Sequence, residues 1–314
     1  MSLTGKFSTA VRLLARAEWA IFRRQIRWHW RNHRLRAAGS RPFIHTTAGH
    51  PLVCFPDWPD SVWQYLHGSD DRWEIALLRS WLEPGDVFVD AGANMGLYAH
   101  AVASHFGGDV RVLALEASPA LVERLHESAR LLGEREISAI PVAVGAEEGQ
   151  VTFYLARAGA TTVSQSMRVD ATEAADYVEH LLPMRTLAAL AGEHLAGRSI
   201  AAVKVDVEGA EPLALRGAPR HWFSSDGAAW VVEINPSALA RMGFRPEDVF
   251  THFPGGSFEQ WILPKYPKIG QPPPRPRRLK TDERFDDAPF YNLIALPAGR
   301  AADARRTRVR RFFT

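Results

Sequence analysis

The chain has 314 residues, 46% of them hydrophobic, and a formal net charge of +3 at pH 7, which allows one large or two small domains with an ordinary packed core. Its single cysteine, Cys54, excludes an intrachain disulfide and a cysteine-based zinc site, and it favours a reducing compartment. The charge is uneven, because residues 6–41 hold ten Lys/Arg against one acid and residues 300–314 hold six Arg against one acid. Two basic ends on an acidic body indicate phosphate-bearing partners or a membrane surface.

Residues 1–42 are predicted to form a basic helical arm. Apolar residues spaced three or four apart, from Val11 to Trp30, predict an amphipathic helix over about residues 8–34, with arginines beside the apolar stripe. The arginines are too frequent for a membrane span, and no apolar run is long enough for a signal peptide. We expect this helix to lie on an anionic membrane surface, and the alternatives are packing on its own domain and an Arg-rich transit peptide.

Strands alternate with helices along the rest of the chain. A tryptophan-rich helical lead-in (43–82) contains a helix at 70–82 and precedes the main domain (83–299), and a basic tail (300–314) follows it. The predicted strands are 86–92, 110–118, 137–145, 149–156, 200–209, 228–235, 258–264 and 290–297. The predicted helices of the main domain are 95–106, 119–133, 210–218 and 246–253. This order predicts an α/β fold with a mostly parallel, doubly wound sheet that ends in an antiparallel pair at one edge, and residues 270–287 are predicted to be an exposed loop.

A glycine-rich turn joins the first strand of the predicted sheet to its helix. DAGANMG (90–96) places Asp90 at the end of the strand and Gly92 and Gly96 in the turn, while Glu116 ends the next strand. A carboxylate at that place can accept both hydroxyls of a ribose. Because the glycine spacing differs from that of dinucleotide folds, we expect a ribose compound without a pyrophosphate, with Asp90 beside its cationic amino-acid part. S-adenosylmethionine has that form, and tight packing alone is the alternative for such a turn.

Several acids lie at the ends of the predicted strands 200–209 and 228–235. Asp206 and Glu208 would point the same way in an extended strand, and Glu233 lies at the same rim. We predict that Asp206 or Glu208 acts as a general base, with its pKa raised by the crowding of like charges. These acids could together supply oxygens to Mg²⁺, or Glu208 and Glu211 could instead begin the next helix. We favour the second interpretation and expect no metal.

The chain resembles the FkbM family of S-adenosylmethionine-dependent methyltransferases over roughly residues 70–300. KVDVEGAE (204–211) is the most specific piece and resembles the family signature K-[IV]-D-[VI]-E-G-x-E, and DAGANMG strengthens the match. EASP (116–119) stands where the family commonly has E-P-x-P, but Glu116 is kept. The resemblance implies a class I, Rossmann-like, seven-stranded sheet whose last strand is antiparallel. It also implies O-methylation of hydroxyls, often on sugars or secondary metabolites.

By the same resemblance the residues of the cofactor site can be carried over one by one. The methionine-side loop would consist of Asp90, Gly92, Asn94 and Gly96. Glu116 would bind the ribose. Ala117 and Ser118 would line the adenine, with Val142 or Ala143 across from them.

The sequence therefore predicts an S-adenosylmethionine-dependent O-methyltransferase that acts on a sugar, glycan, glycolipid or secondary metabolite by in-line transfer with a carboxylate base. If the arm lies on a membrane, the enzyme is expected in the cytoplasm on the inner face of the membrane, with a lipid-linked or surface glycan as acceptor. One alternative is an RNA methyltransferase that uses the basic ends. The acidic body and the lack of a recognised RNA-binding module oppose it, so no nucleic-acid partner is expected. The other alternative is a non-catalytic membrane-surface protein with this fold.

Overall fold

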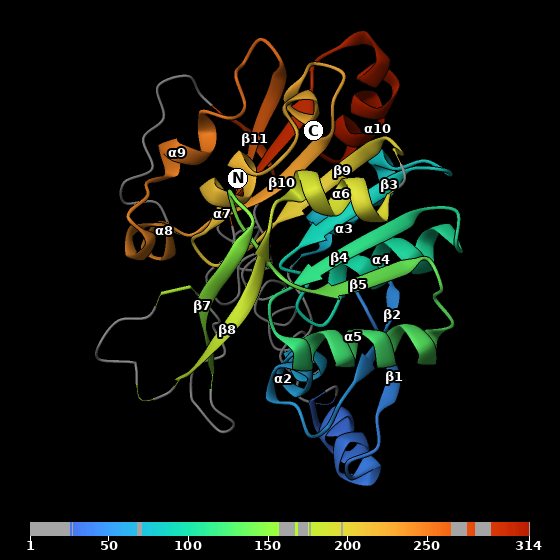
Figure 1. Ribbon diagram of the computed structural model, residues 1–314. Helices are drawn as coiled ribbons and strands as arrows, with labels where there is room; N and C mark the ends of the chain where they lie inside the picture. The colour runs from blue at the N-terminus through green and yellow to red at the C-terminus, as the bar shows by residue number, and fades with distance from the viewer. Residues whose placement is uncertain are drawn as a thin grey trace, which may run out of the picture. The chain divides into compact units, whose positions relative to one another are not determined.

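The computed structural model describes residues 26, 28–67, 71–156, 167–168, 175, 177–195, 197–264, 275–279 and 290–313 (Figure 1). The chain divides into a smaller unit, Met1–Thr47 with Val53–Ser69, and a larger unit, Ala48–Leu52 with Asp70–Thr314. Most of the predicted arm lies outside the described residues, although Ile26 and residues 28–38 are helical. No helix in the described part of the chain has the length and apolar character that a membrane crossing requires.

The lead-in begins with two strands, where helix was predicted. β1 (Phe43–Thr47) and β2 (His50–Cys54) form a two-stranded sheet, and α2 (Pro59–His67) follows. The two residues between the strands are both left-handed, with φ of 45° at Ala48 and 78° at Gly49. Two left-handed residues in succession are what a tight two-residue hairpin requires, so this local turn explains the strands.

The larger unit is built on one sheet with the strand order β12-β11-β13-β10-β9-β3-β4-β5. Its strands are β3 (Val87–Ala91), β4 (Arg111–Glu116), β5 (Ile137–Pro141), β9 (Ile200–Val205), β10 (Ala229–Ile234), β11 (Phe258–Pro264), β12 (Arg277–Arg278) and β13 (Tyr291–Pro297). Five neighbouring strands pair in parallel in the order β10-β9-β3-β4-β5. β13 is antiparallel to both of its neighbours, β10 and β11. The predicted mostly parallel, doubly wound sheet with an antiparallel last strand is confirmed, and within the described residues the two-residue β12 adds an eighth strand to the seven that were expected.

The last two long strands, β11 and β13, form the antiparallel pair that the sequence predicted at this end of the sheet, but β11 is not its outermost strand. β13 lies between β10 and β11, and the edge position is taken by β12, which pairs with Trp261 and Ile262 of β11. β12 belongs to the segment 270–287 that was predicted to be a loop. All seven residues of β13 are buried, and a strand that is apolar on both faces and buried throughout belongs inside a sheet rather than at its rim.

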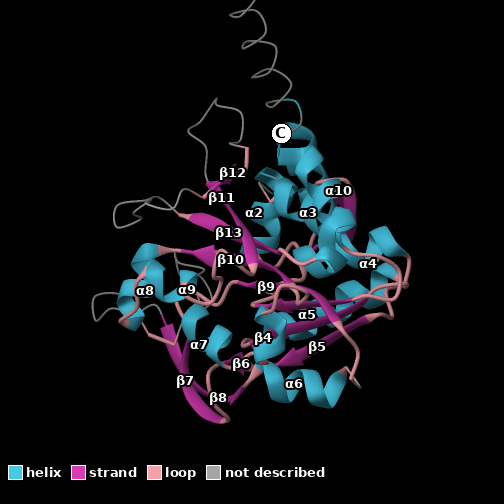
Figure 2. Ribbon diagram, turned by 90° about the horizontal axis from the view of Figure 1, so that it is seen from above, coloured by secondary structure: helices cyan, strands magenta, loops and turns pink. Residues whose placement is uncertain are grey.

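Helices cover both faces of this sheet (Figure 2). Residues of α3 (Arg72–Trp81), α4 (Leu97–Phe106), α5 (Pro119–Leu132) and α10 (Asp303–Phe313) share one apolar core with Phe88. Residues of α6 (Leu187–His194), α7 (Glu211–Arg216), α8 (Pro236–Met242) and α9 (Pro246–Phe250) share a second core with Val87 and Val89. Successive residues of β3 thus point into different cores, as the pleat of a strand requires.

A second sheet follows β5. β6 (Ala143–Val144), β7 (Gly149–Ala156) and β8 (Tyr177–Arg185) form it in the order β6-β8-β7. The single strand predicted over 137–145 is therefore wrong, because the chain leaves the main sheet after Pro141 and enters the small one at Ala143. β8 was not predicted. Only two of its nine residues are buried and it contains Pro183, so it lacks the apolar alternation that marks a strand in sequence.

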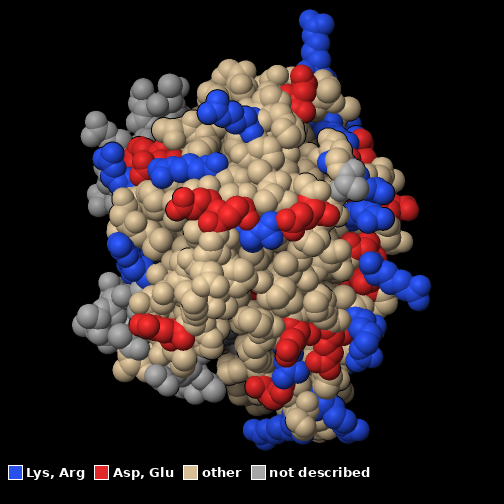
Figure 3. Space-filling view, viewed as in Figure 1, with Lys and Arg blue, Asp and Glu red and all other residues tan. Residues whose placement is uncertain are grey.

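The arginines near the C-terminus are bonded to the larger unit itself. Arg305 donates to Asp86 (2.6 Å) and Glu83 (2.9 Å), and Arg308 also donates to Glu83 (2.6 Å). Arg310 pairs with Glu259 on β11. Figure 3 shows basic and acidic side chains interspersed over the visible face, without a single basic patch. These arginines fasten α10 to the domain, which differs from the phosphate-binding end that their sequence suggested.

Arg305 provides a test of this fastening. Arg305→Gln is expected to lower the free energy of unfolding by about 1–3 kcal/mol, because it removes charge-assisted hydrogen bonds to two carboxylates. Arg311→Gln, an exposed change in the same helix, is the matched control and should stay within about 0.5 kcal/mol of the unchanged protein. Urea unfolding of the three proteins measures the difference, and equal effects of the two substitutions would contradict the assignment.

Candidate functional site

The predicted site residues gather at one edge of the main sheet. β3 lies between β4 and β9, and all three strands run in parallel. Asp90 is near the carboxyl end of β3, Glu116 ends β4, and Asp206 follows β9 directly. The chain order reverses at β3, and such a switch point is where open α/β sheets bind ligands.

The loop after β3 is shaped by left-handed residues and a close backbone approach. Gly92, Asn94 and Gly96 have φ of 79°, 51° and 82°. A Cβ at Gly92 would lie only 1.7 Å from the carbonyl oxygen of Asp206, so no other residue fits there without movement. The amides of Gly92 and Ala93 both donate to the carbonyl of Leu115, at 2.8 and 3.0 Å. The loop is therefore fixed between the end of β4 and the turn after β9.

Glu116 holds this loop from the side of β4. One carboxylate oxygen accepts the backbone N–H of Asn94 and the other accepts that of Ser118, each at 2.9 Å. Burial raises the pKa of Glu116, and the two amides oppose that rise. A carboxylate has about four lone-pair positions, so each oxygen can still accept a hydrogen bond from a ligand hydroxyl.

The structure brings the predicted adenine-side residues together next to Glu116. Ala117 and Ala143 lie in one apolar cluster with Phe153 and Leu182. The amide of Val142 donates to the carbonyl of Glu116 at 2.8 Å. Ser118, buried, precedes the first residue of α5. Their contact with an adenine stays a prediction.

A buried lysine is shared by two aspartates beneath the loop. The Lys204 Nζ is 3.1 Å from Oδ2 of Asp206 and 3.8 Å from Oδ1 of Asp90, and it lies 4.7 Å from the centre of the Tyr98 ring. Burial raises the pKa of Asp90 to about 6, against the opposing attraction of Lys204. The side chain of Asp90 is fully buried, whereas that of Asp206 is 22% exposed. Of the two aspartates, Asp206 is the one that can meet a ligand in this conformation.

The expected parallel orientation of Asp206 and Glu208 is wrong. β9 ends at Val205, and Glu208 has a left-handed φ of 54°, so the chain turns where an extended strand was assumed. Glu233 lies within β10, is buried, and pairs in register with Asn292 of β13. Asn292 in turn donates to the buried Glu74 of α3. The sequence reasoning missed Glu74, and the only signal was one asparagine in an otherwise apolar strand.

Glu211 stabilises the turn after β9. It is almost completely buried, and one carboxylate oxygen accepts the amides of Val207 (3.0 Å) and Gly209 (3.2 Å). Burial raises its pKa to about 8. These contacts favour the interpretation in which Glu211 begins α7. Within the described ranges no group of three or more His, Cys, Asp or Glu is arranged to hold a metal ion.

His100 supports the loop from α4 by packing beneath it. It is fully buried, and its Nδ1 is 2.5 Å from a carboxylate oxygen of Glu134, just beyond the end of α5. A Cβ at Gly96 would meet the His100 ring at 3.0 Å. The ring therefore fills the space under the loop and links α4 to the chain after α5. A histidine on a helix has no sequence signal that distinguishes this packing role from others.

Comparison with known proteins gives one match to a family of sequences. A family model described as the methyltransferase FkbM domain matches residues 90–260. This range contains all the predicted cofactor-loop and catalytic residues. No curated protein sequence is similar enough to the chain to count as a match.

The solved structures that resemble this chain share little of its sequence. The chain is 15% identical to a methyltransferase FkbM from Methylobacillus flagellatus KT, with a TM-score of 0.41, 74% of this chain covered and 52% of that one. It is 13% identical to a precorrin-6y C5,15-methyltransferase from Geobacter metallireducens GS-15, with a TM-score of 0.36 and coverage of 72% and 88%. It is 12% identical to an rRNA methylase from Streptococcus thermophilus, with a TM-score of 0.38 and coverage of 73% and 97%. The chain thus spans about half the length of the first of these proteins.

The close approach at Gly92 predicts a loss of stability that a matched glycine does not share. Gly92→Ala is expected to cost about 1–3 kcal/mol more free energy of unfolding than Gly85→Ala, because only Gly92 adds a steric overlap. Gly85 has a similar left-handed φ of 91°, and no described atom lies within 4 Å of the position that a Cβ would take there. Both substitutions therefore share the conformational penalty of about 1–2 kcal/mol. Chemical denaturation of both variants measures this, and equal losses would contradict the contact.

Glu211 predicts a pH dependence of stability. Its pKa is about 8 in the folded protein against an ordinary value of 4.5, so the unfolded chain loses this proton first, and stability falls as pH rises from about 4.5 to 8. Glu211→Gln keeps an oxygen for the two amides and removes the titration, so this variant should lose less stability over that range. Urea unfolding at about pH 5 and pH 8 gives the slopes. Glu247→Gln, an exposed change on α9, should keep the original slope, and a Glu211→Gln slope that does likewise would refute the assignment.

Proposed function

The chain belongs to the FkbM methyltransferase family, and from this we propose that it transfers a methyl group from S-adenosylmethionine to a hydroxyl of a sugar, glycan, glycolipid or secondary metabolite. The observation that carries the proposal is the set of carboxylates at the sheet edge. Glu116 lies on one side of the loop after β3. Lys204, with its partners Asp90 and Asp206, lies on the other side.

The residues at this edge fit the cofactor. Glu116 keeps lone pairs for the two ribose hydroxyls while it holds the loop. Ala117 and Ala143 offer an apolar surface for the adenine. Asp90 was expected to contact the amino group of the methionine part, but its carboxylate is fully buried. We therefore assign Asp90 an indirect role, in which its negative charge lies under the loop and fixes Lys204.

For methyl transfer the protein must align the acceptor hydroxyl with the methyl group and accept one proton. When bound, S-adenosylmethionine supplies a methyl group that is already activated as a sulfonium. A neutral hydroxyl is a poor nucleophile, so a nearby base contributes to the rate. Asp206 is our first choice, because it is partly exposed and is held in place by Lys204 at 3.1 Å. It takes the proton of the acceptor hydroxyl on its carboxylate. Glu208 in the same turn and Glu233 at the end of β10 are the other candidates.

The choice of acceptor follows the family resemblance, and two other functions compete with it. An RNA substrate would need free basic residues, whereas Arg305, Arg306, Arg308 and Arg310 are bonded to the protein. That pairing removes these C-terminal arginines as support for RNA binding, and the acidic body also favours a small-molecule or glycan acceptor. A non-catalytic role is opposed by the complete set of Asp90, Glu116 and Asp206. We place the enzyme in the cytoplasm, on the inner face of the membrane if its smaller unit binds lipid.

Two measurements test the proposal. Calorimetry with S-adenosylmethionine should show binding to the wild-type protein, to Asp206→Asn and to Glu208→Gln. Transfer of labelled methyl to lipid and glycan extracts should fall by about 10² or more in the variant that lacks the base. Glu247→Gln on α9 is the control and should keep full transfer. A wild-type protein that binds no S-adenosylmethionine would end the proposal, and full transfer by both Asp206→Asn and Glu208→Gln would remove the base assignment.

A further inference from the structure

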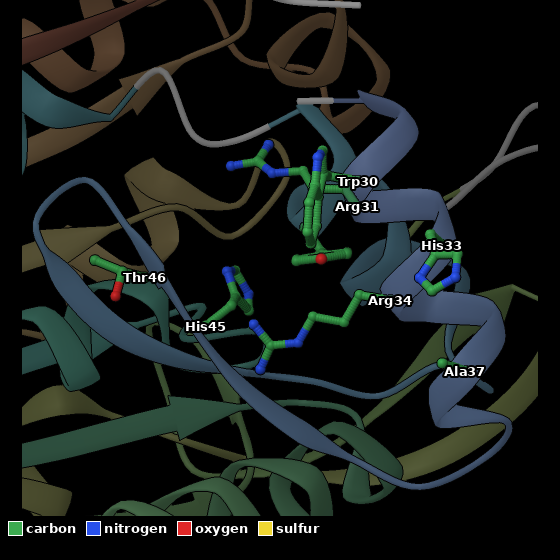
Figure 4. A pocket seen from close by; sticks show the side chains of 8 residues that line it. Trp30, Arg31, His33, Arg34, Ala37, His45 and Thr46 are labelled. Atoms are coloured by element: carbon green, nitrogen blue, oxygen red, sulfur yellow. The ribbon is translucent and has the colours of Figure 1, made fainter. Parts of the chain in front are cut away.

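The smaller unit contains a pocket that the methyltransferase site does not use. Its volume is about 500 Å³, and its walls come from the helix of residues 28–38, from β1 and from α2. Figure 4 shows the side chain of Arg34 extending from the helix towards His45, with Trp30 and Arg31 on the other side of the space. Tyr65 also lines it. The pocket is large enough for a small organic group as well as an inorganic ion.

Two guanidinium groups give the pocket its charge. Arg31 donates to the carbonyl of Leu66 and Arg34 to that of Ile44, each at 2.8 Å. Their carbon centres lie 5.5 Å from the Tyr65 ring and 4.7 Å from the Phe43 ring. Neither makes an ion pair with any residue that the structure describes. A guanidinium has five N–H donors, so both are held in place and still have donors for an anion.

A neutral histidine completes the polar lining. His45 is 8% exposed, and its Nδ1 has no hydrogen-bond partner among the described residues. Burial and the charge of Arg31 lower its pKa to about 4, so it is uncharged at neutral pH and one ring nitrogen can donate or accept. Two cations without partner acids in the described chain and a buried, unpartnered polar atom suit a doubly charged oxyanion. Planar guanidinium groups bind phosphate oxygens in pairs.

The same unit carries exposed apolar side chains close in sequence to these groups. Trp30 is 74% exposed, Trp63 58%, Trp28 46% and Ile26 43%. Tryptophan with arginine is the composition of a surface that lies at the headgroup level of a membrane. We infer that the pocket binds a phosphate ester through Arg31 and Arg34, and that the exposed tryptophans favour a phospholipid headgroup as its source. This inference concerns the smaller unit and stands whether or not the proposed reaction is correct.

The test uses the full chain, with two arms that separate the possible sources. In the first arm, glycerol 3-phosphate is titrated into the protein and followed by calorimetry. In the second, the protein is sedimented with phosphatidylcholine vesicles with and without phosphatidic acid. Arg34→Gln should weaken binding by about tenfold or more, since it removes charge-assisted hydrogen bonds. Arg36→Gln is the matched control, because it makes the same charge change on an exposed residue of the same helix, outside the pocket, and it should have much less effect.

Each result decides between the possibilities. Binding of glycerol 3-phosphate that Arg34→Gln loses and Arg36→Gln keeps supports a pocket open to soluble phosphate esters. The same pattern with phosphatidic acid vesicles alone supports the lipid headgroup. Equal losses in both variants, or no binding in either arm, would overturn the inference. Arg34→Lys keeps the charge but loses the planar pair of donors. It serves as the second variant, with circular dichroism to confirm folding, and wild-type binding by Arg34→Lys would count against recognition by a guanidinium.

Discussion

The contact between the loop after β3 and the turn after β9 is the constraint on which the site depends. The backbone at Gly92 runs so close to the carbonyl of Asp206 that no side chain fits between them. The amide of Asp206 also donates to the carbonyl of Ala91 at 3.0 Å. Because two loops are in direct backbone contact, the residues that they carry hold fixed positions relative to each other. Glu116 adds a third point of attachment through Asn94. The loop after β3 is therefore held by the protein's own contacts, without a ligand.

The contact between these two loops also explains how one lysine, Lys204, can lie close to two aspartates. Lys204 reaches Asp90 and Asp206 because β9 lies directly beside β3 and their ends are in register, with Asp90 paired to Lys204 itself. Two carboxylates and one ammonium give the cluster a net negative charge. The burial of Asp90 raises the free-energy cost of holding that charge. The cluster is therefore stabilised by any further positive charge near the loop, which is consistent with a cationic cofactor at this edge.

Much of the architecture follows from the sequence, and the exceptions have physical causes. The parallel strands and the helices between them follow from apolar runs and periodicity, and the bounds of β7 and β11 agree with the prediction to the residue. The antiparallel pair of β11 and β13 was expected, whereas the edge strand β12 was not, because strand order depends on tertiary pairing, which a local pattern does not encode. The glycine turn and Glu116 were recognisable from their spacing. That Lys204 could pair with a neighbouring acid was also recognisable, but its sharing between Asp90 and Asp206 was not. The roles of Glu74 and His100 were beyond reach, since burial and long-range partners decide them. The basic ends show the same limit, because net charge does not reveal which arginines meet an acid within the fold.

The position of β13 has a consequence for how the protein is made. β10 and β11 are both synthesised well before the strand that must lie between them, because that strand is translated after them. The sheet therefore cannot assemble in the order of synthesis, and β10 and β11 each wait with an unpaired side until Tyr291–Pro297 appears. Exposed strand sides of this kind invite incorrect pairing. A nascent chain that stops before this strand lacks the bridge that joins two parts of the sheet, and its loss would affect far more of the domain than seven residues.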